Sequence, residues 1–323
     1  MVKKILAISI IVIFCGAAVL YVKAGWNDLP FDAAAKEKAP GSFVQLHDGN
    51  IHYYWVEPTQ QVATGEIVVM SHGYGIPGFM FQQIADILAE EGHRVLIYDH
   101  FGHGYSDRPS GPYDQAFFER ELNDLVTELH IETPFFLVGQ SMGGLIAAQY
   151  AAQHPEKVKK LALFVPAGLR MYESKYKLLT DMLDVPLLGE WIWRVVGRAA
   201  MYQPLPPPCD VCGNGTLSGD RFVQARYEGY FAALLDILRH FPMKNQDHIY
   251  QKLAEGNVPT LALFGEQDEL IMPTSAALLK KYVPRANITL LPEGDHELHI
   301  RHWRRVGPMV ANWFNSNKNA VLQ

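Results

Sequence analysis

The sequence predicts a doubly wound, mostly parallel α/β sheet with a helical cap insertion and an N-terminal transmembrane helix. Short apolar runs alternate with amphipathic segments before residue 169 and again after residue 250, as in parallel strands joined by helical crossovers. Residues 169–250 break this alternation and show helical segments instead. Residues 5–22 form an uncharged apolar run, which is about the length that crosses a bilayer core.

Residues 1–24 are predicted to be a membrane anchor, with a cleaved secretion signal as the alternative. The apolar run is long for the corresponding region of a signal peptide, whereas the small residues at 22–24 suit cleavage. Lys3 and Lys4 precede the run, and positive residues of this kind stay on the cytoplasmic side. We therefore expect a single-pass protein with its globular part on the non-cytoplasmic side, or a secreted protein if the signal is cleaved.

The composition indicates a globular protein without a nucleic-acid partner. The 323 residues are 49% hydrophobic and carry a net charge of −6, and basic clusters are lacking. Cys209 and Cys212 form a C-x-x-C pair within a Pro- and Gly-rich segment, but no second pair completes a zinc site. A local disulfide and two free thiols both remain open for this pair.

The alternation divides the chain into a linker, a core in two parts, a cap and a tail. Residues 43–58 predict a hairpin that turns at residues 48–50. The divisions are 25–42 (linker), 43–168 (core, first part), 169–250 (cap or lid), 251–317 (core, second part) and 318–323 (tail). Predicted core strands are 66–72, 94–100, 134–140 and 158–168, and a strand followed by a loop is predicted at 260–270 and at 287–297. Predicted helices are 81–92, 116–130, 274–283 and the segment after Ser141, with 305–314 as part of a closing helix.

Ser141 lies where a predicted strand meets a helix, with Gly139 and Gly143 two residues away on either side. A tight turn there would expose the hydroxyl and direct the first helical N–H groups at the same point. Side chains at the two glycine positions would clash within such a turn. A nucleophilic serine also needs a base, an orienting acid and oxyanion donors. The alternative is a serine that only caps the helix.

From about residue 43 onward the chain resembles the α/β-hydrolases. The resemblance is carried, in family order, by "SHGYG", "YDHFGHGYSDRP", "GQSMGG", "FGEQDEL" and "EGDHELH". It implies Ser141 as nucleophile, Asp268 as acid and His296 as base. It also implies an oxyanion hole formed by the N–H groups of Tyr74 and Met142, and it requires no cofactor and no metal.

Neighbouring carboxylates and histidines offer alternatives to two of these assignments. Glu266 and Glu269 flank Asp268, but the spacing from the preceding glycine favours Asp268. His299 and His302 follow at helical intervals and suggest a metal site. Metal binding would consume the catalytic base, and no further ligands complete a tetrahedron.

The residue before the predicted base departs from the family pattern. Asp295 stands where the family usually has glycine, and we expect it to alter the pKa environment of His296. His72 and His103 are expected to brace the loops around the site.

A dinucleotide-binding fingerprint competes with the hydrolase interpretation. Residues 73–78 read G-x-G-x-x-G, and Asp99 follows about 20 residues later. Pro77 removes one N–H group from this loop, and an NAD(P)-dependent dehydrogenase would leave the serine motif unexplained. A binding protein of the same fold without turnover is a further alternative.

The predicted function is a membrane-anchored serine esterase or lipase that cleaves small-molecule esters, with apolar acyl groups, through an acyl-enzyme. A hydrolase of carbon–carbon bonds in ring-cleavage products is the main alternative. In the cap, the large apolar side chains either pack against one another or line an acyl tunnel. These side chains are Leu183, Leu187, Leu188, Trp191 and Trp193, and the two tryptophans are the predicted substrate-binding residues.

Overall fold

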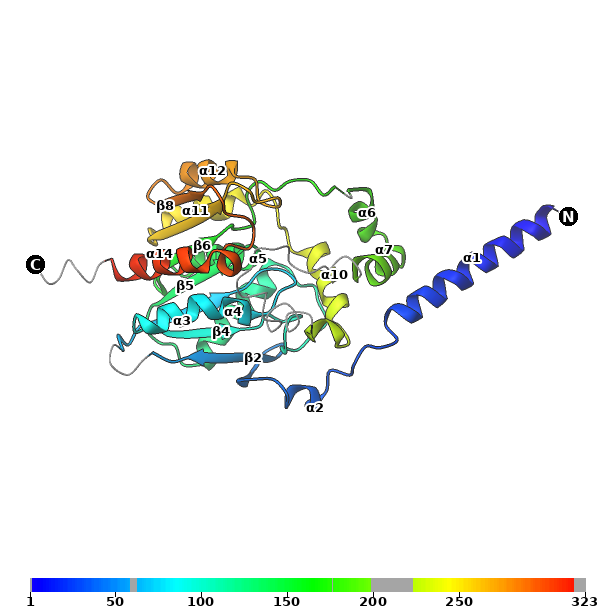
Figure 1. Cartoon of the computed structure of the whole chain (residues 1–323), viewed down its shortest axis with the longest axis horizontal. Helices are drawn as coiled ribbons and strands as arrows, with labels where there is room; N and C mark the ends of the chain where they lie inside the picture. The colour runs from blue at the N-terminus through cyan, green and yellow to red at the C-terminus, as the bar shows by residue number, and fades with distance from the viewer. Residues whose placement is uncertain (1, 59–62, 176, 199–222, 317–323) are drawn as a thin grey trace, which may run out of the picture.

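The core is a single eight-stranded sheet with the strand order β1-β2-β4-β3-β5-β6-β7-β8. The computed structural model describes residues 2–58, 63–175, 177–198 and 223–316 (Figure 1). The strands are β1 (Ser42–Leu46), β2 (Gly49–Val56), β3 (Ile67–Ser71), β4 (Arg94–Tyr98), β5 (Phe135–Gln140), β6 (Val158–Phe164), β7 (Thr260–Gly265) and β8 (Asn287–Leu291). β1 and β2 are antiparallel additions, and all pairs from β4 to β8 are parallel.

Every predicted core strand is present, but the hairpin turn lies earlier than the predicted residues 48–50. Leu46 pairs with Gly49, so the turn consists of residues 47 and 48. Every residue of β5 and of β7 is buried. Strands covered on both faces read as continuous apolar runs, which is why the sequence indicated them clearly.

Helices cover both faces of the sheet. They are α3 (Gln82–Glu90), α4 (Gln115–Glu128), α5 (Met142–Gln153), α11 (Asp247–Glu255), α12 (Thr274–Tyr282), α13 (Leu298–Arg301) and α14 (Trp303–Asn315), with a short 3₁₀ turn, η1 (Gly78–Phe81). Helix α3 packs against α14, whereas α5 packs against α4 and α11. Right-handed crossovers place α3 and α5 on opposite faces, because β3 connects to β4 on one side and β5 connects to β6 on the other.

This reversal marks the switch point of the sheet, at the carboxyl ends of β3 and β5. Ligands of open α/β sheets bind where adjacent strands send their helices to opposite faces. Ser141 follows β5 directly, and the loop that contains Tyr74 follows β3. The topology therefore brings two of the predicted site segments together.

The described part of the cap consists of short helices. They are α6 (Lys177–Asp181), η2 (Met182–Asp184), α7 (Leu188–Ile192), η3 (Trp193–Gly197), η4 (Val223–Arg226) and α10 (Tyr230–His240). Cys209 and Cys212 lie outside the described residues. The predicted end of the cap at residue 250 falls inside α11, and the division into core and cap stays a prediction.

Helix α1 (Val2–Ala24) projects away from the rest of the molecule (Figure 1). In the described part of the chain it is the one helix long and apolar enough to cross a membrane, with a mean hydropathy of 2.8. This agrees equally with an anchor and with a signal sequence. The segment after α1 returns along the cap, where the Leu29 backbone bonds to Arg226 and Glu228. The predicted linker is thus attached to the globular part.

Candidate active site

Ser141 occupies a strained backbone position between β5 and α5. Its φ is +52° and its ψ is −116°, a conformation that non-glycine residues rarely adopt. The backbone holds it there through a bond from Ser141 N to Phe164 O (3.0 Å) and bonds from Gly144 N and Ala167 N to Ser141 O (3.0 and 2.9 Å). The turn presents the half-buried side chain at the first turn of α5.

The two flanking glycines are required by the close approach of backbone to backbone. A Cβ atom on Gly143 would lie 2.2 Å from Ser71 O, and one on Gly139 would lie 2.4 Å from Gly143 O. Both distances are far below contact distance for a side-chain carbon. The structure thus supplies the steric reason that the sequence pattern indicated.

Loops after β7 and β8 place an acid and a base beside this serine. His296 Nε2 lies 3.0 Å from Ser141 Oγ, and His296 Nδ1 lies 2.9 Å from Asp268 Oδ2. The other carboxylate oxygen, Asp268 Oδ1, accepts hydrogen bonds from Leu270 N and Ile271 N at 2.7 and 2.8 Å. The structure therefore brings together Ser141, His296 and Asp268, three residues that are far apart in sequence.

The competing carboxylates lie elsewhere. Asp268 is buried, whereas Glu266 and Glu269 are exposed, and Glu269 forms a surface ion pair with Lys175. This placement favours Asp268 as the partner of the imidazole.

The predicted oxyanion donors lie on both sides of the elbow. Met142 is the first residue of α5, so its N–H has no acceptor within the helix. Gly73, next to Tyr74 in the chain, approaches the elbow so closely that a Cβ there would lie 3.3 Å from Ser141 Cβ. The Tyr74 hydroxyl bonds to Leu234 O of the cap at 3.1 Å. The backbone N–H groups of Tyr74 and Met142 thus remain our assignment for the oxyanion hole.

A cluster of buried histidines lies below the Tyr74 loop. His72, His100 and His103 pack edge to face, with ring centroids 4.5 Å (72–100) and 5.0 Å (72–103) apart. Burial, with the neighbouring ring of His100, lowers the pKa of His72 to about 3, so this ring is neutral near pH 7. It accepts a hydrogen bond from His100 N at 2.9 Å. These contacts brace the loop.

His299 and His302 do not join such a cluster. Burial lowers the pKa of His299 to about 3, and its ring packs on Phe81. His302 Nε2 lies 4.0 Å from Asp295 Oδ1. Within the described ranges, no three His, Cys, Asp or Glu side chains are placed to hold a metal ion.

The glycine-rich loop uses its N–H groups inside the protein. Gly78 N donates to Asp99 Oδ1 at 2.7 Å, and Gly75 N donates to His103 Nε2 at 3.0 Å. The carboxylate predicted to bind a ribose in the dinucleotide interpretation therefore binds the loop itself. This geometry gives no support to a phosphate cradle.

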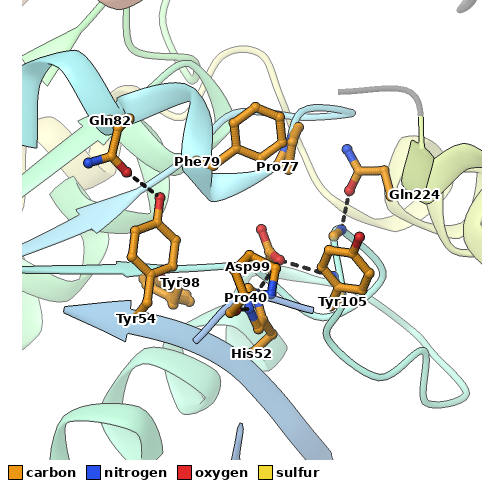
Figure 2. Close-up of a pocket in the computed structure, with 11 residues that line it drawn as sticks. Pro40, His52, Tyr54, Pro77, Phe79, Gln82, Tyr98, Asp99, Tyr105 and Gln224 are labelled. Atoms are coloured by element: carbon orange, nitrogen blue, oxygen red, sulfur yellow. Dashed lines mark hydrogen bonds and ion pairs between the residues drawn. The ribbon is translucent and has the colours of Figure 1, made fainter. Parts of the chain in front are cut away.

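Asp99 lines a cavity of about 460 Å³ at the end of β4. Figure 2 shows its carboxylate bonded to His52 and to the backbone of Tyr105, with Tyr54 bonded to Gln82 above. Aromatic and proline side chains form most of the remaining wall, and Ser141, His296 and Asp268 are not among its lining residues. The cavity is thus separate from the serine.

The indole N–H groups of Trp191 and Trp193 both bond within the protein. Trp191 Nε1 donates to Ala17 O of α1, and Trp193 Nε1 donates to Phe231 O of α10, each at 2.8 Å. Their predicted role in substrate binding stays a prediction. Of the other cap side chains, Leu183 is buried in a cluster with Ile192 and Leu235, which agrees with the alternative that these side chains pack within the cap. Leu187, which is 85% exposed, and Leu188, which is also exposed, do not pack in this way.

One contact near the site has no signal in the sequence. Gln140 is buried beside the serine, and its Nε2 donates to His296 O at 3.2 Å, which ties the base loop to β5. Only its adjacency to Ser141 could have drawn attention to it.

Competing effects set the pKa of His296. Burial lowers it, while the hydrogen bond to Asp268, the charge of Asp268 and the charges of Glu297 and Asp295 raise it, and the net pKa lies above 6.5. Asp295 also forms an ion pair with Arg301. The carboxylate that replaces the family glycine therefore adds to the basicity of the imidazole.

This predicts the acid limb of the pH–rate profile. Because only neutral His296 accepts a proton, kcat/KM should rise with pH and level off above a midpoint higher than 6.5. Asp295→Asn should move that midpoint to lower pH, because it removes a charge that stabilises the imidazolium. Glu57→Gln, at an exposed ion pair with Arg94, is the control and should leave it unchanged. A midpoint that stays in place in Asp295→Asn would contradict this assignment.

With this geometry in place, comparison with known proteins defines the class of the molecule. The family model for the alpha/beta hydrolase fold matches residues 66–191, a span that includes the elbow. The chain belongs to the α/β-hydrolase family.

Individual relatives are similar over most of their length. Lipase 3 of Moraxella sp. (strain TA144) is 27% identical over 245 residues, which are 72% of each chain. Human monoacylglycerol lipase ABHD6 is 26% identical over 273 residues, covering 78% of this chain and 76% of that one. The enol-lactonase from Burkholderia xenovorans LB400 superposes with a TM-score of 0.68 at 19% identity, covering 85% of this chain and all of the other, and shares the fold.

Proposed function

We propose that the protein is a serine hydrolase that cleaves carboxylic esters of apolar acyl groups through an acyl-enzyme. The chain is a hydrolase of the carboxylesterase type, and its similarity to lipases supports ester hydrolysis. One observation carries the finer proposal, namely the hydrogen-bonded series from Asp268 through His296 to Ser141.

The geometry supports a two-step mechanism. Asp268 accepts the Nδ1–H of His296 and fixes the tautomer that leaves Nε2 as acceptor for the Ser141 proton. Ser141 Oγ attacks the acyl carbon, and its proton passes to Nε2. The N–H groups of Tyr74 and Met142 stabilise the oxyanion. His296 then protonates the leaving alcohol. In the second step water attacks the acyl carbon and gives a proton to His296, which passes it to Ser141 Oγ as the acid leaves.

The two N–H donors to Asp268 support this role for the acid. They occupy the carboxylate oxygen that does not face the imidazole, so the oxygen that bonds to His296 is fixed in direction. An oriented carboxylate also stabilises the imidazolium that forms during attack.

The N-terminal helix supports a location at the membrane. We propose that α1 is retained as a single-pass anchor and that Lys3 and Lys4 keep its start in the cytoplasm. The catalytic domain then lies on the non-cytoplasmic side. An enzyme held at a bilayer meets esters that partition into it, which favours apolar acyl groups.

A series of p-nitrophenyl esters tests the substrate class. We expect kcat/KM to rise from acetate to at least octanoate, because each methylene buried contributes about 0.8 kcal/mol, nearly a fourfold factor. A ring-cleavage dienoate assayed beside the series should be a poor substrate. Rates that peak at acetate, or preferential turnover of the dienoate, would contradict the proposal.

A further inference from the structure

The cap is fastened to the carboxyl-terminal half of α1. Trp191 Nε1 donates to Ala17 O at 2.8 Å, and Arg194 Nε donates to Tyr21 O at 3.2 Å. The Arg194 guanidinium also lies over the Tyr21 ring, 4.6 Å from its centroid. Figure 1 shows α6 and α7 at the end of the molecule from which α1 projects. These contacts join α1 directly to the cap.

The position of Ala17 along α1 gives its depth relative to the bilayer interface. Lys23 and the exposed Trp26 follow the apolar run, and such residues mark the bilayer interface. Ala17 precedes Lys23 by six residues, or about 9 Å of helix at 1.5 Å per residue. If α1 spans the membrane, its Ala17 carbonyl lies on the hydrocarbon side of that interface. The side chain of Trp191 must then reach the same depth.

The cap segments that precede Trp191 carry exposed apolar side chains. We call them the cap edge: Leu178, Leu179, Val185, Leu187 and Leu188, all of which are exposed. Leu187 is the N-cap residue of α7, and its carbonyl O accepts a hydrogen bond from Trp191 N at 3.1 Å. The most exposed leucine of the cap therefore lies one helical turn from the residue that contacts α1.

Two ion pairs lie beside the cap edge. Lys177 bonds to Asp181 within α6, and Glu190 bonds to Arg239 of α10. Paired charges cost less to bring to a bilayer surface than isolated ones. An apolar patch bordered by paired charges is typical of an interaction surface.

We propose that the cap edge inserts into the acyl-chain region of the leaflet beside α1. The occupant of this surface is lipid, because the surface is continuous with the lipid-facing side of α1 and is fixed at hydrocarbon depth by Trp191. The inference rests on the proposed retention of α1. It places the cap of the proposed ester hydrolase within the layer that holds apolar substrates.

Site-specific photocrosslinking in the full-length chain tests the inference without relying on catalysis. Benzoylphenylalanine replaces Phe14, Leu187 or Leu290 in separate variants, reconstituted in phosphatidylcholine liposomes whose acyl chains carry an alkyne tag. Phe14 reports on the anchor, and the exposed Leu290 of β8 is the control on the core. We expect strong lipid adducts at positions 14 and 187 and background adducts at 290.

The three positions separate the possible failures. Adducts at 14 with only background at 187 would overturn cap insertion while leaving the anchor in place. Background at all three positions would remove the anchor and the inference together, but not the ester hydrolase. A crosslink from position 187 to a second protein chain would show a protein interface and would also overturn the proposal.

A functional variant gives a second readout. The double change Leu187→Asp and Leu188→Asp should lower hydrolysis of an ester embedded in liposomes about tenfold, since full burial of one leucine is worth at least that factor. Hydrolysis of a soluble short-chain ester should not change. Equal activity on the embedded ester, or an equal loss on both esters, would contradict insertion of the cap edge.

Discussion

Replacement of Ser141 by alanine should reduce ester turnover on the order of a millionfold, the scale found when the nucleophile of a serine triad is removed. The Oγ atom bonds to His296 Nε2, and the alanine cannot form an acyl-enzyme. Steady-state kinetics on a p-nitrophenyl ester measures the loss. Thermal unfolding should stay close to that of the wild type, because this change removes only one half-buried hydroxyl.

A suitable comparison is Ser106→Ala. Ser106 is a buried serine whose Oγ bonds to Asp99 O and to His52 N, away from the Ser141 elbow. It should lower stability and leave kcat largely intact. Activity near wild type in Ser141→Ala would remove the serine from the mechanism.

Replacement of Asp268 by asparagine should cost about 10⁴-fold in kcat, as for the buried acid of comparable triads. The amide keeps the shape but favours the wrong tautomer of His296, so Nε2 no longer accepts the serine proton. The bonds from Leu270 N and Ile271 N to the side chain can persist, so the loop should fold. Kinetics and thermal unfolding together separate the two effects.

The neighbouring Glu269 provides the matched control. It is exposed and pairs only with Lys175 at the surface. Its change to glutamine should leave kcat within about twofold, the range of ordinary surface substitutions. If Glu269→Gln were the more damaging variant, the acid would have been assigned to the wrong carboxylate.

The sequence was most informative where burial is complete. β5 and β7 are covered on both faces, so their continuous apolar runs predicted buried strands clearly. The hairpin turn was misplaced because Asp48-Gly49 is typical of turns, whereas Gly49 begins β2 with a φ of +147° and pairs with Leu46. Local turn chemistry alone could not show this register.

Contacts between distant segments could not be predicted in this way. The bond from Trp191 to Ala17 joins residues 174 positions apart, and that from Gln140 to His296 joins residues 156 apart. The sequence does not show whether Leu187 is packed or exposed, because hydrophobicity alone does not identify the apolar surface that a side chain contacts. Motif order located the candidate triad residues, and the geometry adds the distances between them.

The most direct test of the proposed mechanism is peptide mapping of the covalent intermediate. The enzyme is quenched in acid during turnover of a slowly deacylating ester, digested and examined by mass spectrometry. We expect one acyl group on the peptide that contains Ser141 and no acylation of that peptide in Ser141→Ala. Efficient hydrolysis with no acyl group on Ser141, or with the acyl group on another residue, would contradict the mechanism.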